Sequence, residues 1–246
     1  MSLYKGKLLS IGSNPKINKS DKSGKGFKTA ILHLSPYKLS GKNFCANASP
    51  GCIDGCLNVA GHGRFDSVQN ARLNKSHFFI RDKFGFMKQL IKEIESFERH
   101  CEKRKLKPAI RLNGTSDIPF ENIKIQDTEK TWSPLINIFQ RFSNVQFYDY
   151  TKSKRRALSK TLPKNYDLTF SRSEITPDED IFSILKNDKN IAVVFKDSIP
   201  ERFMNHPVIN GDNTDLRFLD PKGFIIGLSA KGKAKKDQSG FVVKFN

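Results

Sequence analysis

The 246-residue sequence predicts a single α/β domain built as an incomplete parallel (β/α)6-type barrel. Short runs rich in β-branched residues alternate along the chain with segments of helical periodicity, which is the pattern of repeated βαβ units. Most of these runs also end in polar residues, and parallel α/β folds carry their functional groups at the carboxyl ends of strands. Periodicity alone leaves a doubly wound sheet open as the alternative.

The chain begins with a segment that predicts a basic N-terminal arm over residues 1–28, before a domain over residues 29–246. The arm contains seven lysines and one aspartate among glycine, serine and asparagine. The predicted strands are Thr29–Ser35, Pro108–Gly114, Val145–Thr151, Tyr166–Ser171, Ile191–Asp197, Pro207–Gly211 and Gly223–Ser229. The predicted helices are Ser76 to about Lys105, Ser133–Phe142, Lys152–Lys160 and Asp178–Lys186.

The formal net charge of +18 favours a polyanionic partner, and nucleic acid is the commonest one. A lysine-rich surface that only keeps the protein soluble is the alternative. No apolar run approaches the roughly 18–20 residues that span a bilayer. The first residues lack the apolar core and cleavage site of a signal peptide, so we expect a cytoplasmic protein.

Three of the four cysteines lie close together in the sequence NFCANASPGCIDGC, after the first predicted strand. Thiols stay reduced in the cytoplasm, so the clustered Cys45, Cys52 and Cys56 predict a metal centre in a cysteine-rich loop. Soft thiolates suit zinc and iron. Cys101 lies near the end of the long predicted helix and is expected to be a half-buried helix thiol.

Two metal centres are compatible with three cysteine ligands. An open fourth position suits a [4Fe-4S] cluster with one iron that the protein does not ligate. If His62 is the fourth ligand, the site is instead a closed Cys3His zinc site. The zinc alternative predicts a colourless, non-catalytic nucleic-acid-binding protein.

The order of these parts resembles the radical S-adenosylmethionine enzymes. In that superfamily three cysteines in the loop after the first strand hold the cluster, and a glycine-rich segment ending the second strand contacts the cofactor. Here the corresponding second segment is RLNGTSDIP, residues 111–119. The superfamily spacing is Cys-x3-Cys-x2-Cys, whereas this chain has Cys-x6-Cys-x3-Cys. The resemblance implies S-adenosylmethionine as a cofactor and radical chemistry.

A second likeness is to the bacteriophage gene-product-eighty-eight-like group. Cys45, Cys52 and Cys56 followed by GRF at residues 63–65 resemble the cysteine segment of that group. The stretches RLNGTSD, FYDYTK and GLSAKGKAKKDQSGF resemble it as well. This likeness covers the chain from about Gly26 onward and implies a phage origin, without an assigned activity.

Polar residues after the strands supply the predicted cofactor-binding set, which lies on the same face as the cysteines. Its members are Asn113, Ser116, Asp117, Asp149, Lys152, Arg172, Glu174 and Asp212. Asp212 and Asp215, together with Asp117, would suit a metal-dependent nuclease, the rival enzyme class. Basic residues in YDYTKSKRRALSK and in SAKGKAKKDQSGF are candidates for phosphate contact, the second as a mobile loop.

Overall fold

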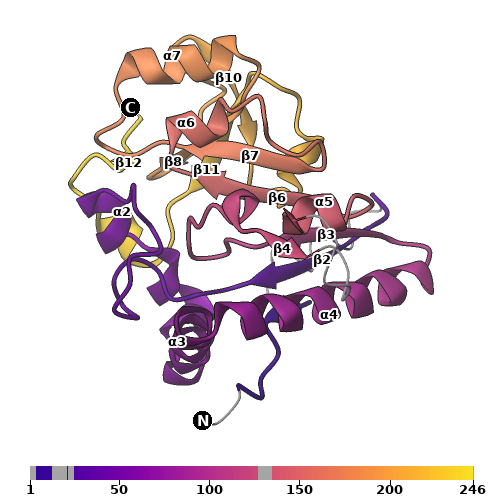
Figure 1. Cartoon of the computed structure of the whole chain (residues 1–246). Helices are drawn as coiled ribbons and strands as arrows, with labels where there is room; N and C mark the ends of the chain where they lie inside the picture. Colours follow the sequence, from indigo (N-terminus) through magenta and orange to yellow (C-terminus); the bar gives the residue numbers. More distant parts are fainter. Residues whose placement is uncertain (1–3, 13–20, 22–24, 127–134, 246) are drawn as a thin grey trace.

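The computed structural model describes residues 4–12, 21, 25–126 and 135–245, and its centre is one mostly parallel sheet (Figure 1). The strand order is β1-β2-β3-β6-β7-β8-β11-β10-β9, with β12 paired to β8 off this path. Neighbouring strands are parallel from β2 to β10, and β1 and β9 add antiparallel edges. The strands of this sheet are β1 Leu9–Ile11, β2 Phe27–Leu32, β3 Lys107–Arg111, β6 Gln146–Thr151, β7 Tyr166–Ser171, β8 Ile191–Phe195, β9 Arg202–Phe203, β10 His206–Asn210, β11 Ile225–Ser229 and β12 Val242–Val243.

The α/β class is confirmed, and the sheet, which ends at β1 on one side and β9 on the other, does not close into a barrel. A separate pair of short strands, β4 Ile125–Gln126 and β5 Leu135–Ile136, lies outside this sheet. The α-helices are α2 Pro50–Asp54, α3 Asp66–Arg81, α4 Lys83–Glu102, α5 Ile138–Arg141, α6 Lys154–Ala157 and α7 Asp178–Lys186. The 3-10 helices are η1 Leu57–Val59, η2 Gly61–Arg64, η3 Phe120–Asn122, η4 Arg217–Leu219 and η5 Gly232–Lys236.

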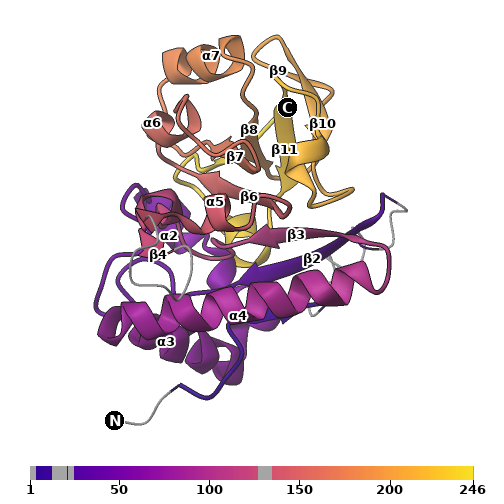
Figure 2. The same cartoon turned by 45° about the vertical axis from the view of Figure 1, so that its right-hand side comes forward.

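The helices α4 and α7 cover the same face of the sheet. Ile110 of β3 belongs to the apolar core that α4 completes, and Phe170 of β7 belongs to the core that α7 completes. Phe147 is the partner of both Ile110 and Tyr166 in the register, and Phe170 lies four residues after Tyr166. Because side chains alternate between faces along a strand, all these residues share one face. Figure 2 shows α4 running along β2 and β3 on this side.

The long helix predicted over 76–105 is wrong as a single element. The helical segment begins earlier, at Asp66, and breaks at Asp82, whose φ of −143° is not helical. The Asp82 side chain accepts a hydrogen bond from the backbone N–H of Gly85 at 2.8 Å and so caps α4. The apolar spacing continues across this break, which is why periodicity alone did not reveal it.

The N-terminal strand β1 lies within the segment for which the sequence predicts a basic arm. Leu8 and Leu9 are buried in the core, and Leu9 pairs with Leu32 of β2. Glu93 of α4 accepts hydrogen bonds from both of their backbone N–H groups, at 2.8–3.0 Å. Leu9 therefore joins the sheet, and Leu8 packs into the core directly before β1. Residues 1–3, 13–20 and 22–24 of the predicted arm lie outside the described residues.

The C-terminal strands do not simply extend the sheet in chain order. Strand β11 lies between β8 and β10, and β12 pairs with the second half of β8. Strand β7 pairs with β8 only as far as Ala192, and β12 then pairs with Val194 and Phe195. The carboxyl ends of β7 and β8 are thus separated by β12.

No helix in the described part of the chain has the length and apolarity needed to cross a membrane.

Candidate functional site

The three clustered cysteines lie between β2 and α3, in residues 45–56, here called the cysteine segment. Cys52 lies in α2, and Ser49 caps that helix by accepting a hydrogen bond from the backbone N–H of Cys52 at 3.3 Å. Cys56 caps η1, its Sγ accepting from the N–H of Asn58 at 3.5 Å. Cys45 precedes α2, and its Sγ lies 3.8 Å from the carbonyl oxygen of Thr115, beyond the end of β3.

All three thiols of the cysteine segment are free and partly exposed. Burial raises the pKa of Cys45 to about 11, and the nearby thiols of Cys56 and Cys52 contribute to the increase. Burial also raises the pKa of Cys52 and Cys56. The thiols therefore share one electrostatic environment and are protonated at neutral pH.

Two cations lie close to these thiols. The ammonium group of Lys152 opposes the increase in the pKa of Cys52, and the guanidinium of Arg72 does the same for Cys56. Arg72 comes from α3 and also donates to the side-chain oxygen of Asn58 at 2.7 Å. The sequence pattern gave no reason to select Arg72, because it lies before the predicted start of the helix at Ser76.

The cysteine segment does not form a preassembled site for a single ion. Among the described residues, no group of three or more His, Cys, Asp or Glu side chains is placed to hold a metal ion. His62 lies in η2, is exposed, and has its ring 5.9 Å from that of Phe65. A tetrahedral zinc site needs its ligands within about 2.3 Å of one point, so the closed Cys3His arrangement is not formed here.

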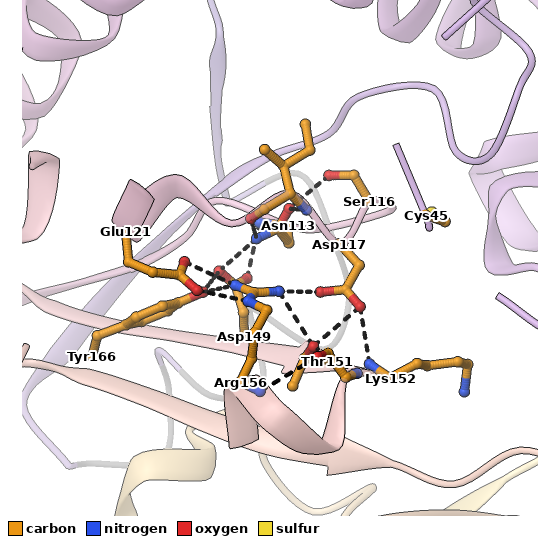
Figure 3. Close-up of polar contacts among 12 residues, drawn as sticks. Cys45, Asn113, Ser116, Asp117, Glu121, Asp149, Thr151, Lys152, Arg156 and Tyr166 are labelled. Carbon is orange, nitrogen blue, oxygen red and sulfur yellow. Dashed lines mark hydrogen bonds and ion pairs between the residues drawn. The ribbon is translucent and has the colours of Figure 1, made fainter. Parts of the chain in front are cut away.

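Three members of the predicted cofactor-binding set are buried in one hydrogen-bonded group (Figure 3). They are Asn113, Ser116 and Asp149. The Oδ1 of Asn113 accepts from the Ser116 hydroxyl at 2.9 Å and from the N–H of Ile118 at 2.7 Å. Asp149 accepts from the N–H of Asn113 at 2.9 Å and from the hydroxyl of Tyr166 at 3.1 Å. These side chains fix the turn after β3 and are not directed at an open site.

Asp117 is held by β6 and α6. Its Oδ2 accepts from the N–H of Lys152 at 2.9 Å and from the hydroxyl of Thr151 at 3.1 Å. Its Oδ1 pairs with the guanidinium of Arg156, which also donates to Glu121 at 2.6 and 2.9 Å. Within the basic run YDYTKSKRRALSK, Glu121 and Asp117 thus already neutralise the Arg156 guanidinium (Figure 3). Phosphate contact by this run stays a prediction.

Lys152 and Glu174 lie close to the cysteine segment, as does Asp117, and Arg172 lies beside the C-terminal segment. The Nζ of Lys152 donates to the carbonyl oxygens of Ser171 and Arg172, both at 3.1 Å, and burial lowers its pKa. Glu174 accepts from the Ser49 hydroxyl at 2.6 Å and from the N–H of Gly51 at 2.7 Å. Glu174 therefore fixes the start of α2. Arg172 instead donates a hydrogen bond to the carbonyl oxygen of Gly240 in the C-terminal segment, at 2.9 Å.

The aspartates proposed for a nuclease site lie apart. Asp215 is buried and bonded to Arg111 at 2.9 Å, whereas Asp212 accepts from the N–H of Ser229 at 3.0 Å near the surface. Asp117 is bonded to Arg156. Among the described residues these three carboxylates do not form a metal-binding group.

The basic C-terminal stretch packs on the cysteine segment, contrary to the prediction of a mobile loop. Ala230, Ala234, Phe241 and Val242 form an apolar cluster against which Cys52 packs. Figure 1 shows this yellow segment beside α2. Small alanines and glycine alternate with lysine here, and this alternation is the signal by which an anchored segment could have been recognised.

A family model describes nearly the whole chain: gene product 88 matches residues 7–244. The chain belongs to the gene product 88 family. This confirms the resemblance to the bacteriophage gene-product-eighty-eight-like group that the cysteine segment and GRF indicated. The chain matches no curated protein and no solved structure. The family match includes β1, in agreement with its place in the sheet.

In this gene product 88 protein, Gly51 marks a close contact between α2 and the C-terminal segment. A Cβ at Gly51 would lie 2.2 Å from the Ser239 Oγ and 2.7 Å from the Cβ of Phe241. We expect Gly51→Ala to lower the free energy of unfolding by about 1–3 kcal/mol through overpacking. Asp54→Ala, on the exposed side of the same helix, is the control and should change it by less than about 0.5 kcal/mol. Urea unfolding measures both, and equal midpoints would contradict the contact.

Asp149 should give the stability a specific pH dependence. Burial raises its pKa to about 6, against the opposing effect of Arg111. As the pH rises, the unfolded chain loses the Asp149 proton near pH 4, whereas the folded chain keeps it until about pH 6. Between these values the folded state therefore binds more protons than the unfolded state. This contribution to stability is complete below pH 4 and is lost as the pH rises to 6. We expect the stability of Asp149→Asn relative to wild type to increase by about 2–3 kcal/mol over that interval. If the free energies of unfolding of wild type and Asp149→Asn change with pH in the same way, this prediction is refuted.

Proposed function

We propose that this chain is a phage iron–sulfur protein in which Cys45, Cys52 and Cys56 hold a [4Fe-4S] cluster. The observation that carries this proposal is the placement of three free, partly exposed thiols within one electrostatic environment, at the carboxyl edge of a parallel sheet. Functional groups of α/β folds gather at this edge. A bound cluster would supply electron transfer.

The surroundings favour a cluster over a single zinc ion. A cluster of several atoms holds its thiolates further apart than one ion does, and the thiols of Cys45, Cys52 and Cys56 lie close enough to affect one another's pKa. Lys152 and Arg72 offset the negative charge that three thiolates would bring into a partly buried site. Three protein ligands leave one position for a small molecule.

The sheet supports the comparison with an incomplete (β/α)6 barrel. Strands β2, β3, β6, β7 and β8 lie side by side in chain order, and α4 and α7 cover one face. We propose S-adenosylmethionine as the first small molecule to test at the open ligand position. Lys152, Glu174 and Asp117 are predicted cofactor residues that lie close enough to Cys52 to affect its pKa, whereas Asn113, Ser116 and Asp149 act in the turn after β3.

The nucleic-acid part of the proposal rests on charge. The net charge of +18 attracts polyanions, and the lysines of η5 lie beside the cysteine segment. We therefore propose that the metal centre acts on or near nucleic acid in the cytoplasm of the host cell.

The experiment that tests the cluster is anaerobic purification of the full chain, followed by a visible absorption spectrum and metal analysis. A brown protein with several irons per chain is the expected result. A colourless protein with one zinc would overturn the cluster and support the structural zinc site. In that case His62→Ala should lower zinc affinity, whereas in a cluster protein it should leave the iron content unchanged.

A further inference from the structure

We propose that the cysteine segment is bordered by a binding surface for single-stranded nucleic acid, here called the basic rim. The basic rim combines lysines at η5 with exposed residues at η1 and η2, namely Leu57, Arg64, Phe65, Lys231, Lys233, Lys235 and Lys236. This inference rests on the nucleic-acid part of the proposed function, and it names both the class of nucleic acid and the surface that binds it.

Packing fixes η5 next to the cysteine segment. Ala234 is buried in the middle of η5, and a Cβ at Gly55 would lie 3.3 Å from the Ala234 Cβ. At the start of η5, a Cβ at Gly232 would lie 2.9 Å from the Cβ of Ala60. The lysines that flank Ala234 therefore project from a fixed support beside the thiols. The views of α2 and the yellow segment in Figures 1 and 2 agree with this placement.

Three of the lysines in the basic rim are available to a partner, whereas Lys231 pairs with Asp212 at 3.4 Å. Lys233, Lys235 and Lys236 are exposed, and no ion pair joins them to a carboxylate in the part of the chain that the structure describes. The following acidic residue, Asp237, accepts from the hydroxyl of Ser239 at 2.7 Å and from the N–H of Val242 at 3.0 Å. Asp237 thus fastens the C-terminal segment and does not neutralise the lysines.

Exposed apolar side chains occur in η1 and directly after η2, on either side of Ala60, which lies next to Gly232 of η5. Leu57 is 57% exposed and Phe65 is 52% exposed, and the guanidinium carbon of Arg64 lies 6.0 Å from the ring centre of Phe65. Aromatic and guanidinium groups next to phosphate-binding cations are the components that bind unpaired bases. The rim elements are 3-10 helices of three to five residues, too short to read a major groove as an α-helix does. Unpaired bases are therefore the favoured partner.

The test measures binding of fluorescent oligothymidine and oligouridine, each of about 20 nucleotides, and of a blunt duplex, at several salt concentrations. Wild type should bind the single strands more tightly than the duplex. Combined replacement of Lys233, Lys235 and Lys236 by Gln should lower the slope of log K against log salt by about 2. Phe65→Ala should weaken binding by about tenfold. The control replaces Lys88, Lys92 and Lys103 of the α4 region by Gln, with the same loss of charge.

Equal binding by the rim variant and wild type, or duplex binding as tight as single-strand binding, would overturn the proposal. Thermal midpoints of all variants verify that each is folded. The same preparations are analysed for iron, which separates the two proposals. Iron-containing protein that does not bind single strands would support the cluster and refute the basic rim. Metal-free protein that binds single strands through the three lysines would refute the cluster and support the basic rim.

Discussion

Replacing Arg156 with methionine should lower the free energy of unfolding by about 3–5 kcal/mol. The Arg156 side chain is 10% exposed and neutralises Asp117 and Glu121, which are 10% and 12% exposed. Removing one partner of a buried ion pair leaves the others charged and desolvated. Thr151 and Tyr166 would also lose a donor. Chemical denaturation followed by circular dichroism measures the loss.

Arg155→Met is the matched control for this variant. Arg155 is the preceding residue in α6 and is exposed, so its replacement should change the stability by less than about 0.5 kcal/mol. If Arg155→Met and Arg156→Met are equally stable, the ion pairs drawn in Figure 3 do not support the fold.

Replacing Cys45 with alanine should reduce the metal content of the anaerobically purified protein by at least about tenfold. Loss of even an outer partner of a metal ligand costs about 10–100-fold in affinity, and removal of a ligand should cost no less. Cys45 is the thiol between the ends of β2 and β3, and among the described residues its Sγ bonds only to backbone groups, one of them the carbonyl oxygen of Thr115. Its removal should therefore disturb the fold little. Iron and sulfide analysis measures the result.

Cys101→Ala controls for the number of thiols. Cys101 is fully buried in α4 within the main apolar core, away from the cysteine segment. This variant should retain the metal content of wild type. Full metal content in Cys45→Ala, or equal loss in both variants, would refute the ligand assignment.

Much of the sheet follows from local pattern. The strand predicted over Tyr166–Ser171 and the helix over Asp178–Lys186 agree with β7 and α7 at both ends. These elements combine an apolar face with clear boundaries, since Pro177 precedes α7 and acidic residues occupy its first turn. The cysteine segment was also placed at the correct edge, because each parallel strand delivers its following residues there.

The features that were missed depend on contacts between distant residues. The two-residue strand β12 has no pattern of its own and exists because β7 leaves β8 after Ala192. Arg156 resembles its basic neighbours in sequence, and only the fold brings Asp117 and Glu121 to it. Asn113 follows β3 and Asp149 lies within the adjacent strand β6, where the two residues bond to each other. Periodicity cannot distinguish such a pair from one that is open to a ligand.

The insertion of β12 between β7 and β8 has a consequence for biosynthesis. Residues 45–56 leave the ribosome long before residues 230–243, and at roughly 5–20 residues per second the interval is on the order of 10 s. Until then Cys52 lacks the cover of Phe241 and Ala234. A metal donor or an oxidant therefore reaches Cys52 most easily on the growing chain, before residues 230–243 fold against it.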